Sequence, residues 1–528
     1  MGTLLSMRKE TLPFDNVYAF FHFSEESSWI KLKPKLEGYF SDCELKRLSL
    51  LFPTKSGYTI IIERNYIDKD YRDTFCNFHA KKFVTPDART IRLHFFTANI
   101  SVEDLYAADQ DMLQKNYFGY SVLRPTMPNH LGRTLVRYLP FNSVNKYPSY
   151  GMACTEYVHL QGITIPVRGF PFISQDIDAT SCAESTIWML LRYYSNKHTY
   201  YKECYPFEIA QMRDNNYPRE RMAYHTKGMT VREIENCLKS SGFCPIVYNR
   251  ESVDALQKKL SDRDKFIPQN LFLHILYAYI ESGFPVILEL RNFRHVILAI
   301  GHQAKKNTFE EPEHNYHFTS DDCISLLIND DNCFPYQVLQ TKESHLPENK
   351  IVSNYSLDDV TTFIVPTAEK IFLSAEKFLQ IVKTILTSSN DELQQFNYKK
   401  NSPLLKQEKI VLRTFITTGK AFKSHMHSRG ASPEINWCYL NMPLPHFIWV
   451  CELSTPASIP NGEIWGEIIW DATTETSDLS GILAVHYPEV LFINEGIVQN
   501  QHSSIRQYKI KRKAVAYKMY QNNLEEIL

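Results

Sequence analysis

A strand–turn–strand pattern near the middle of the chain constrains its fold more than any other feature. The segment 286–301, VILELRNFRHVILAIG, contains two apolar runs separated by RNFR. Short apolar runs bounded by turn residues are typical of strands buried in a sheet. The apolar residues between Phe272 and Ile280 follow a helical spacing, and Gly283 and Pro285 come after them. We therefore expect a helix and then two buried strands joined by a turn.

The length of the chain and the distribution of its motifs and predicted elements divide it into three regions. A chain of 528 residues is too long for one ordinary core, so roughly two to four domains are expected. Residues 151–345 contain the strand–turn–strand pattern and the other motifs described below. Residues 1–150 and 346–528 mix predicted strands and helices without a motif that indicates chemistry, and we predict an α/β accessory domain in each. The predicted fold class of the whole chain is α+β.

The balance of charges limits the classes of partner. The chain has 58 Lys and Arg against 59 Asp and Glu, which gives a net charge of −1, and it has no basic run. Such a chain lacks the positive field that draws a protein to nucleic acids and anionic membranes. No apolar run approaches the length needed to cross a bilayer. We therefore expect neither a nucleic-acid partner nor a transmembrane segment.

Targeting signals and cysteine usage indicate the compartment. The first residues become charged too early for a secretory signal. They fit the pattern for N-myristoylation, Gly2 with Ser6, and the alternative is an ordinary N-terminal tail. The 11 cysteines are scattered and include no C-x-x-C pair, which argues against a zinc site and indicates free thiols. We expect a cytoplasmic protein with neither a metal nor an organic cofactor.

One cysteine lies where a helix is predicted to begin. In SQDIDATSCAESTIWMLLRYY, residues 174–194, Ser181 and Glu184 form an S-x-x-E capping box, and apolar residues follow at helical spacing. With Ser181 as the N-cap, Cys182 is the first helical residue. The unpaired N–H groups and the positive end of the helix dipole favour the thiolate there, which is the nucleophilic form. Cys182 is therefore a candidate nucleophile, against the common alternative of a small buried hydrophobic residue.

A thiolate nucleophile needs a base, and histidine is the usual one. Among the 18 histidines, His295 is the best placed, because it begins the second strand of the strand–turn–strand pattern. A side chain at the mouth of a strand can project into a cleft, whereas the alternative is a hydrogen-bonded histidine of the core. His302 follows Gly301 at the other end of the same strand, and we expect it at the surface.

A third residue is expected to orient the imidazole by accepting its second N–H. The segment 325–336, SLLINDDNCFPY, is a predicted strand that ends in a polar cluster. Asp330 is the leading candidate and Asp331 and Asn329 are alternatives, although such clusters also form turns. The order of the candidates along the chain is therefore Cys, His, Asp.

The cysteine-bearing helix, RHVILAIG and LLINDD together resemble the papain-like cysteine peptidase superfamily, closest to the branch that trims the leader peptides of bacteriocins. The resemblance covers the middle region only. It implies a central domain in which a helix bearing Cys182 packs on an antiparallel sheet bearing His295 and Asp330. In this family a Gln before the Cys helps to form the oxyanion hole, and Gln175 in ISQDIDATSC matches it. The resemblance also implies a thioester intermediate and hydrolysis of a peptide or isopeptide bond in a protein or peptide substrate.

Two alternatives to a peptidase remain open. A papain-like scaffold without activity would act as a protein-binding module, with the outer regions as its contact surfaces, because a fold does not guarantee an activity. A Cys-dependent acyltransferase or amidase would use the same residues, but it would pass the acyl group to an amine or act on a small molecule. The sequence does not distinguish hydrolysis from acyl transfer.

Overall fold

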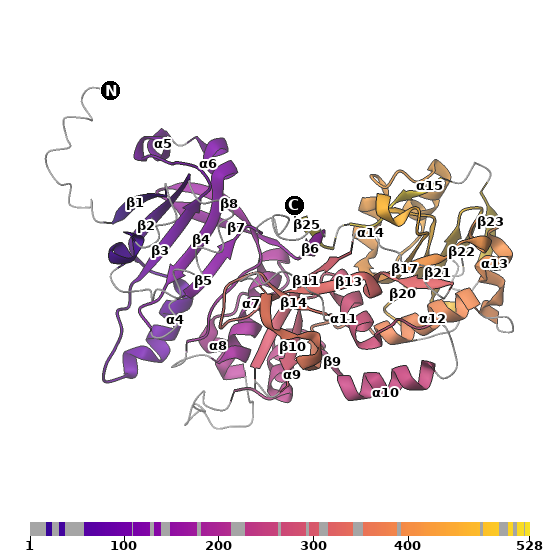
Figure 1. Cartoon of the computed structure of the whole chain (residues 1–528), viewed down its shortest axis with the longest axis horizontal. Coiled ribbons are helices and arrows are strands. Elements are labelled where there is room, and N and C mark those ends of the chain that lie inside the picture. Colours follow the sequence, from indigo (N-terminus) through magenta and orange to yellow (C-terminus); the bar gives the residue numbers. More distant parts are fainter. Residues whose placement is uncertain are drawn as a thin grey trace.

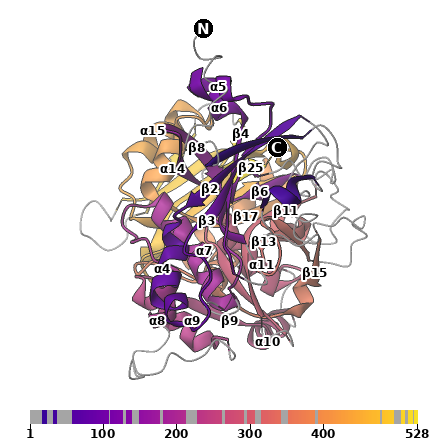
Figure 2. The ribbon, with the colours of Figure 1, turned by 90° about the vertical axis from the view of Figure 1, so that its left-hand side faces the viewer.

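The computed structural model of the chain contains three main β-sheets, which follow one another along its long axis (Figure 1). Figure 2 views the molecule from the N-terminal end, so that the first sheet faces the reader. The residues that the structure describes are 17–23, 31–36, 57–107, 109–126, 131–138, 148–176, 181–212, 228–261, 266–291, 295–305, 315–341, 352–387, 392–475, 479–495, 505–510, 515–521 and 523–527. Gly2 and Ser6, which carry the predicted myristoylation pattern, lie outside them.

The N-terminal sheet has five antiparallel strands in chain order. They are β1 (Tyr18–Phe23), β2 (Tyr58–Tyr66), β3 (Thr90–Phe96), β4 (Tyr117–Leu123) and β5 (Leu131–Val136). Three helices connect them, α4 (Lys69–Asn77), α5 (Val102–Ala107) and α6 (Gln110–Asn116). A hairpin of β7 (Cys154–Leu160) and β8 (Ile163–Gly169) packs against this sheet and shares a hydrophobic cluster with it.

The middle sheet contains the strand–turn–strand pattern, and its strands lie in the order β15-β14-β13-β11-β10-β16-β9. The strands are β9 (Ile246–Asn249), β10 (Val286–Leu290), β11 (His295–Ala304), β13 (Cys323–Asn329), β14 (Gln337–Gln340), β15 (Val352–Ser356) and β16 (Val360–Val365). β6 (Ser149–Gly151) pairs with the far end of β11, and β25 (Glu525–Ile527) pairs with β6. A Cβ on Gly301 would lie 2.2 Å from the carbonyl oxygen of Tyr150, so the approach of β6 requires a glycine in β11.

Helices accompany the middle sheet. They are α7 (Cys182–Lys197), α8 (Pro206–Met212), α9 (Val231–Ser240), α10 (Arg250–Ser261) and α11 (Leu271–Glu281). α7 packs against β11, and nearly all of its side chains after Cys182 are buried. α11 ends where the sequence predicts, and Gly283 follows it with a positive φ of 80°.

The C-terminal sheet has seven strands, in the order β12-β17-β18-β20-β21-β22-β23. These are β12 (Tyr316–Phe318), β17 (Ile410–Thr418), β18 (Phe447–Ser454), β20 (Gly466–Asp471), β21 (Ile482–Tyr487), β22 (Val490–Asn494) and β23 (Ile505–Lys509), and β19 (Glu463–Ile464) forms a separate pair with β24 (Tyr517–Lys518). The helices of this region are α12 (Ala375–Thr387), α13 (Tyr398–Asn401), α14 (Gly419–Met426) and α15 (Pro433–Asn441).

The architecture is α+β, as predicted, but the outer regions do not have the parallel sheets of an α/β domain. All pairs of the N-terminal sheet are antiparallel, and in the C-terminal sheet only β12 and β17 are parallel. The reason is that strands adjacent in the chain are also adjacent in these sheets, whereas parallel neighbours need a long crossover connection.

The sheets also divide the chain at other points than the predicted boundaries. β15 and β16, residues 352–365, belong to the middle sheet although they follow residue 345. β12 lies in the predicted middle region but pairs with β17 of the C-terminal sheet. One continuous hydrophobic cluster contains side chains from all three regions, for example Ile62, Leu298 and Trp449. The hydrophobic core is therefore continuous across the three regions.

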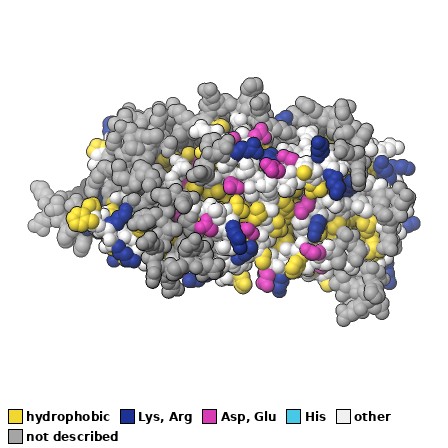
Figure 3. All heavy atoms as spheres, turned by 90° about the horizontal axis from the view of Figure 1, so that it is seen from below, with side chains coloured by type: hydrophobic (Ala, Val, Ile, Leu, Met, Phe, Trp, Pro, Cys, Tyr) yellow, Lys and Arg dark blue, Asp and Glu magenta, His cyan; other side chains and the backbone are white. Residues whose placement is uncertain are grey.

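The described surface carries charges of both signs. On the face shown in Figure 3, Lys and Arg side chains are interspersed with Asp and Glu, and hydrophobic side chains lie between them. In the part of the chain that the structure describes, no helix is both long enough and apolar enough to cross a membrane.

Candidate active site

Cys182 is the first residue of α7, as the capping box predicts. Ser181 is the N-cap, and its backbone N–H donates a hydrogen bond to the carboxylate of Glu184. Cys182 is partly exposed, whereas Ala183 and Glu184 after it are buried. One turn later the hydroxyl of Thr186 donates to the carbonyl of Val296 in β11, at 3.4 Å. The helix is thereby fixed with its thiol at the beginning of β11.

The sheet brings His295 and Asp330 to the same edge. β10 and β11 are antiparallel, with Leu290 opposite His295. β11 and β13 are also antiparallel, with Leu298 opposite Asn329. Because neighbouring antiparallel strands run in opposite directions, the beginning of β11 lies beside the end of β13. Asp330, the next residue after β13, therefore lies beside the imidazole.

The imidazole of His295 connects the thiol to the carboxylate. Its Nε2 lies 2.8 Å from Oδ1 of Asp330, and the two side chains are 6% and 2% exposed. His295 also forms a side-chain hydrogen bond with Cys182. Nε2 is the ring nitrogen that faces Asp330. The structure thus brings together the three residues that the sequence predicts as Cys, His and Asp.

The electrostatics of this site favour a protonated imidazole. Burial opposes a charge on His295, but the hydrogen bonds to Asp330 and Cys182 and the charges of Asp330 and Asp331 outweigh it. Together they raise the pKa of His295 to about 10. A protonated ring has an N–H on both nitrogens, so it can donate to the carboxylate and to the sulfur at once.

The second aspartate of the cluster has a different position. Oδ1 of Asp331 lies 3.8 Å from Nε2 of His295, which is beyond hydrogen-bonding distance. Its side chain is buried, and this burial raises the pKa of Asp331 to about 7. Neither of its carboxylate oxygens has a hydrogen-bond partner among the described residues. The geometry therefore gives the orienting position to Asp330 rather than to Asp331.

Asn329, the third alternative, has a structural role. Its side-chain oxygen accepts the backbone N–H of Tyr336 at 3.0 Å, and its side-chain nitrogen lies 3.4 Å from the carbonyl of Pro171. The side chain is fully buried and points away from His295 to hold the loop after β13. It has no contact with the imidazole among the described interactions.

Gln175 lies at the site and is joined to it through a residue that the sequence analysis missed. Its side-chain Nε2 donates to Oδ1 of Asn332 at 2.5 Å. Asn332 donates its backbone N–H to Oδ1 of Asp330 at 3.0 Å, and its side-chain nitrogen lies 3.4 Å from Nε2 of His295. The signal was present in the sequence, because Asn332 completes the polar run that follows the strand.

One wall of the site is aromatic. The ring of Tyr355, in β15, lies 6.1 Å from the imidazole of His295, measured between ring centroids, with an angle of 48° between the rings. Burial raises the pKa of Tyr355, and the charge of Asp330 contributes to this shift. Tyr355 follows residue 345, so the predicted boundary would have separated it from the site.

The same polar atoms could be considered as a metal site. Ligand atoms of His295, Asp330 and Asp331 lie within 4.8 Å of one another, and all three residues are buried. However, the 2.8 Å separation between Nε2 and Oδ1 is the length of a charge-assisted hydrogen bond. We therefore assign these atoms to the hydrogen-bonded chain that includes the thiol.

His302, expected at the surface, is instead buried at the other end of β11. Only 1% of its side chain is exposed, and its Nε2 lies 2.8 Å from Oε1 of Glu281 in α11. The rings of Tyr150 and Tyr277 pack against it. The prediction was wrong because β11 continues to Ala304, past Gly301, and β6 covers this end of the strand.

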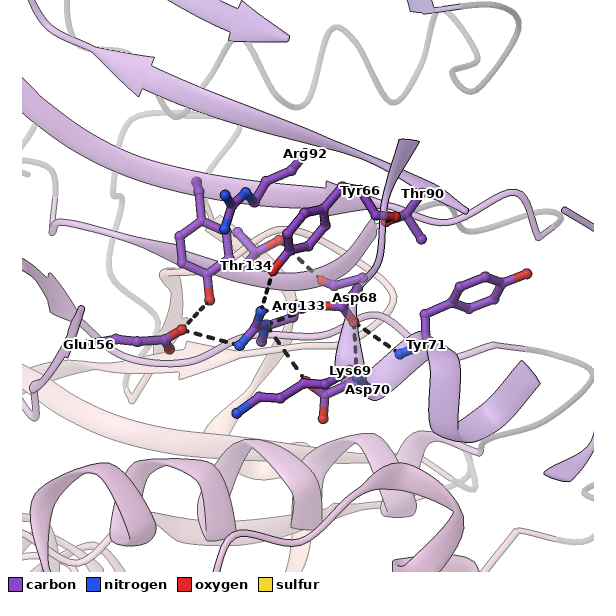
Figure 4. A network of polar contacts seen from close by, with 12 residues as sticks. Tyr66, Asp68, Lys69, Asp70, Tyr71, Thr90, Arg92, Arg133, Thr134 and Glu156 are labelled. Carbon is purple, nitrogen blue, oxygen red and sulfur yellow. Dashed lines mark hydrogen bonds and ion pairs between the residues drawn. The ribbon is translucent and has the colours of Figure 1, made fainter. Parts of the chain in front are cut away.

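α7 is anchored to the N-terminal region by buried charges. Figure 4 shows the part of this network around Arg133. Arg133 in β5 bonds Asp68, Glu156 and the hydroxyl of Tyr66, at 3.1, 3.3 and 3.1 Å. The neighbouring Asp70 accepts the indole N–H of Trp188 at 2.9 Å and a guanidinium N–H of Arg192 at 2.7 Å, both from α7. The helix that begins with Cys182 is thus held at its middle by the N-terminal region. These seven residues connect β2, α4, β5, β7 and α7.

Comparisons with family models, with curated proteins and with solved structures give no match to this chain.

Proposed function

We propose that this chain is a papain-like cysteine peptidase, which hydrolyses a peptide or isopeptide bond in a protein or peptide substrate. The observation that carries the proposal is the continuous hydrogen-bonded chain from Cys182 through His295 to Asp330. A partly exposed thiol at a helix N-terminus, a protonated imidazole and a buried carboxylate are the parts that thiol-based acyl chemistry requires.

The mechanism begins with the thiolate of Cys182. It attacks the carbonyl carbon of the substrate, and the carbonyl becomes an oxyanion. His295 donates its Nδ1 proton to the leaving amine, and a thioester to Cys182 remains. Water, deprotonated by the now neutral His295, then attacks the thioester and releases the acid. Throughout this cycle Asp330 accepts a hydrogen bond from the Nε2–H of His295, and this bond fixes the orientation of the ring.

The oxyanion is stabilised by the backbone N–H of Cys182 and by the side chain of Gln175. The amide nitrogen of Gln175 carries two hydrogens, and one of them is given to Asn332. The second is the donor that we assign to the oxyanion. The loss of one such donor typically costs about 2.7–4 kcal/mol of transition-state stabilisation.

The first test is a competition among cysteines for iodoacetamide near pH 6, read by mass spectrometry of the peptides. An ordinary thiol with a pKa near 8.5 is only about 0.3% ionised at that pH. Cys182 should therefore be alkylated at least about tenfold faster than Cys76 and Cys244, although these two are more exposed. His295→Ala should remove the difference.

The same experiment addresses the scaffold alternative. If Cys182 reacts no faster than Cys76 and Cys244, the chain is a non-catalytic papain-like scaffold and the peptidase proposal is wrong. A reactive Cys182 leaves hydrolysis and acyl transfer as outcomes. Incubation of a thioester substrate with and without an added amine distinguishes them, because a peptidase yields the free acid in both cases and an acyltransferase yields the amide.

A further inference from the structure

The segment that carries Gln175 is held by the N-terminal region rather than by the middle sheet alone. The backbones of Phe172 and Thr134 exchange two hydrogen bonds, at 2.8 and 2.9 Å, and the N–H of Ser174 donates to the carbonyl of Leu131 at 3.1 Å. Thr134 and Leu131 belong to β5, the edge strand of the N-terminal sheet. An isolated β-bridge at Phe172 and one further backbone hydrogen bond therefore tie residues 172–174 to the edge of that sheet.

Two side chains of the N-terminal region hold the residues that follow. Arg124, directly after β4, donates from one guanidinium nitrogen to the carbonyls of Ser174 and Gln175, at 3.0 and 3.3 Å. Nε2 of His79, after α4, lies 3.0 Å from Oδ2 of Asp176, and both side chains are 1% exposed. The N-terminal region thus bonds the backbone carbonyls of Ser174 and Gln175 and the side chain of Asp176.

The loop after β13 holds the side chain of Gln175, because Oδ1 of Asn332 accepts its side-chain N–H. The carbonyl of Gln175 is therefore bonded by the N-terminal region, and its side chain is bonded by the loop after β13. A donor that is fixed in advance contributes more to the stabilisation of an oxyanion than one that must be ordered during the reaction.

Resting on the proposed function, we propose that the N-terminal sheet is part of the catalytic unit, and that Arg124 and His79 are positioning residues which hold Gln175 at the oxyanion. Neither residue touches the reacting atoms. Their effect is transmitted through the 174–176 segment, so they should influence reactions that form an oxyanion and leave other reactions of the same thiol unchanged.

Two reagents separate these reactions. With iodoacetamide the sulfur of Cys182 displaces iodide, a C–S bond forms, and no oxyanion arises. With p-nitrophenyl acetate the sulfur adds to the carbonyl, the resulting oxyanion collapses, and p-nitrophenolate leaves to give an acetyl thioester. Both rates are measured on the full chain, with the rate of the Cys182→Ala variant subtracted.

The variant Gln175→Ala sets the scale for the experiment. It should lower the rate of acylation by about 10²–10³ and change the rate of alkylation by less than about threefold. Arg124→Met and His79→Ala should lower acylation at least about tenfold, again with little change in alkylation. His79→Gln, which restores an N–H donor for Asp176, should recover most of the acylation rate.

Arg137→Met is the matched control. Arg137 is also an arginine of the N-terminal region and also donates to two backbone carbonyls, those of Gln114 and Lys115, at 2.6 and 3.2 Å. These carbonyls belong to α6 and not to the segment of Gln175. This variant should therefore keep both rates.

The inference is overturned if acylation and alkylation fall together in the Arg124 and His79 variants, because that result indicates general damage to the site. It is also overturned if neither rate changes, or if His79→Gln is as slow as His79→Ala. These results differ from a failure of the proposed function, in which Cys182 of the unchanged chain reacts with iodoacetamide no faster than Cys76 and Cys244.

Discussion

Strand β11 has a histidine beside a carboxylate at each of its ends, but the surrounding charges differ. At the site, His295 faces Asp330 and Asp331, and the described residues contribute no Arg or Lys ion pair to either carboxylate. At the far end the carboxylate of Glu281 lies between His302 and Arg413, and Oε2 of Glu281 is 2.7 Å from the guanidinium. One end has an excess of negative charge, whereas the other has a permanent cation.

The different charges around the two histidine–carboxylate pairs determine whether the pKa of the carboxyl group or that of the imidazole is shifted. Burial opposes the charge of Glu281, but Arg413 and His302 hold the pKa of this carboxyl group below its usual value. At the site no such cation competes, and the imidazole of His295 itself retains the proton. A histidine beside a carboxylate is therefore insufficient evidence of chemistry, and the charge balance around the pair must be considered.

The largest expected effect concerns the far end of β11. Arg413 bonds Glu281 in the middle region and Glu452 in β18, at 2.7 and 2.9 Å. In Arg413→Met both buried carboxylates lose this partner, and the free energy of unfolding should fall by about 3–5 kcal/mol. Urea denaturation measures this loss, while the folded variant should keep its rate of alkylation at Cys182.

A matched control for this prediction is Arg506→Met. Arg506 pairs with Glu495 at 3.3 Å, and its side chain is 64% exposed, so the variant should lose less than about 1 kcal/mol. A slower alkylation of Cys182 in folded Arg413→Met would show that the two ends of β11 are coupled, which contradicts the comparison.

The second effect is the pH dependence of stability at the site. The folded pKa of His295 is raised to about 10, above the usual value of the unfolded chain. Protonation of this group therefore stabilises the fold fully below about pH 6.5, and the stabilisation is lost as the pH rises towards 10. His295→Gln should cost about 1.5–3 kcal/mol at pH 6 and progressively less at pH 8 and 9.5.

Asp330→Asn tests the origin of this dependence. The Asp330→Asn variant keeps His295 but lacks the charge of Asp330. Its free energy of unfolding should therefore depend much less on pH, between pH 6 and 9.5, than that of the unchanged chain. Urea denaturation of both variants at the three pH values provides the measurement. A cost of His295→Gln that is constant over this range would mean that the ring is neutral in the folded protein, like an ordinary core histidine.

The smallest effect is expected at Asp331. Its pKa is raised to about 7, because the side chain is buried, so the folded protein binds its proton more tightly than the unfolded chain does. Ionisation of Asp331 therefore destabilises the fold as the pH rises from about 4 through 7. Asp331→Asn cannot ionise, and between pH 5 and 7 it should gain stability relative to the unchanged chain, on the order of 1 kcal/mol. A loss of stability at pH 7 would contradict the assignment.

Local patterns predicted the parts of the site, because each candidate lies at a feature that its neighbours determine. The capping box places Cys182 at a helix start, and the strand–turn–strand pattern places His295 at a strand start. A capping box of the same kind, at Thr230 and Glu233, forms at the beginning of α9. Such patterns depend on residues within a few positions, which the sequence displays directly.

Long-range relations were not predictable in this way. His79 and Arg124 lie about a hundred and about fifty positions from the segment that they hold, and nothing near them in the sequence indicates this contact. The burial of His302 depends on β6, which is distant in the chain. The direction of the outer sheets depends on which strands pair, and apolar periodicity alone does not contain this information.

The exchange of strands between the sheets restricts how a chain like this can change over generations. β12 lies in sequence between β11 and β13 but pairs with β17, while β25 returns to β6 beside β11. A genetic crossover near residue 345 would separate β15, β16 and β25 from the middle sheet and β12 from the C-terminal sheet. We therefore expect the middle and C-terminal regions to be inherited, duplicated or lost together.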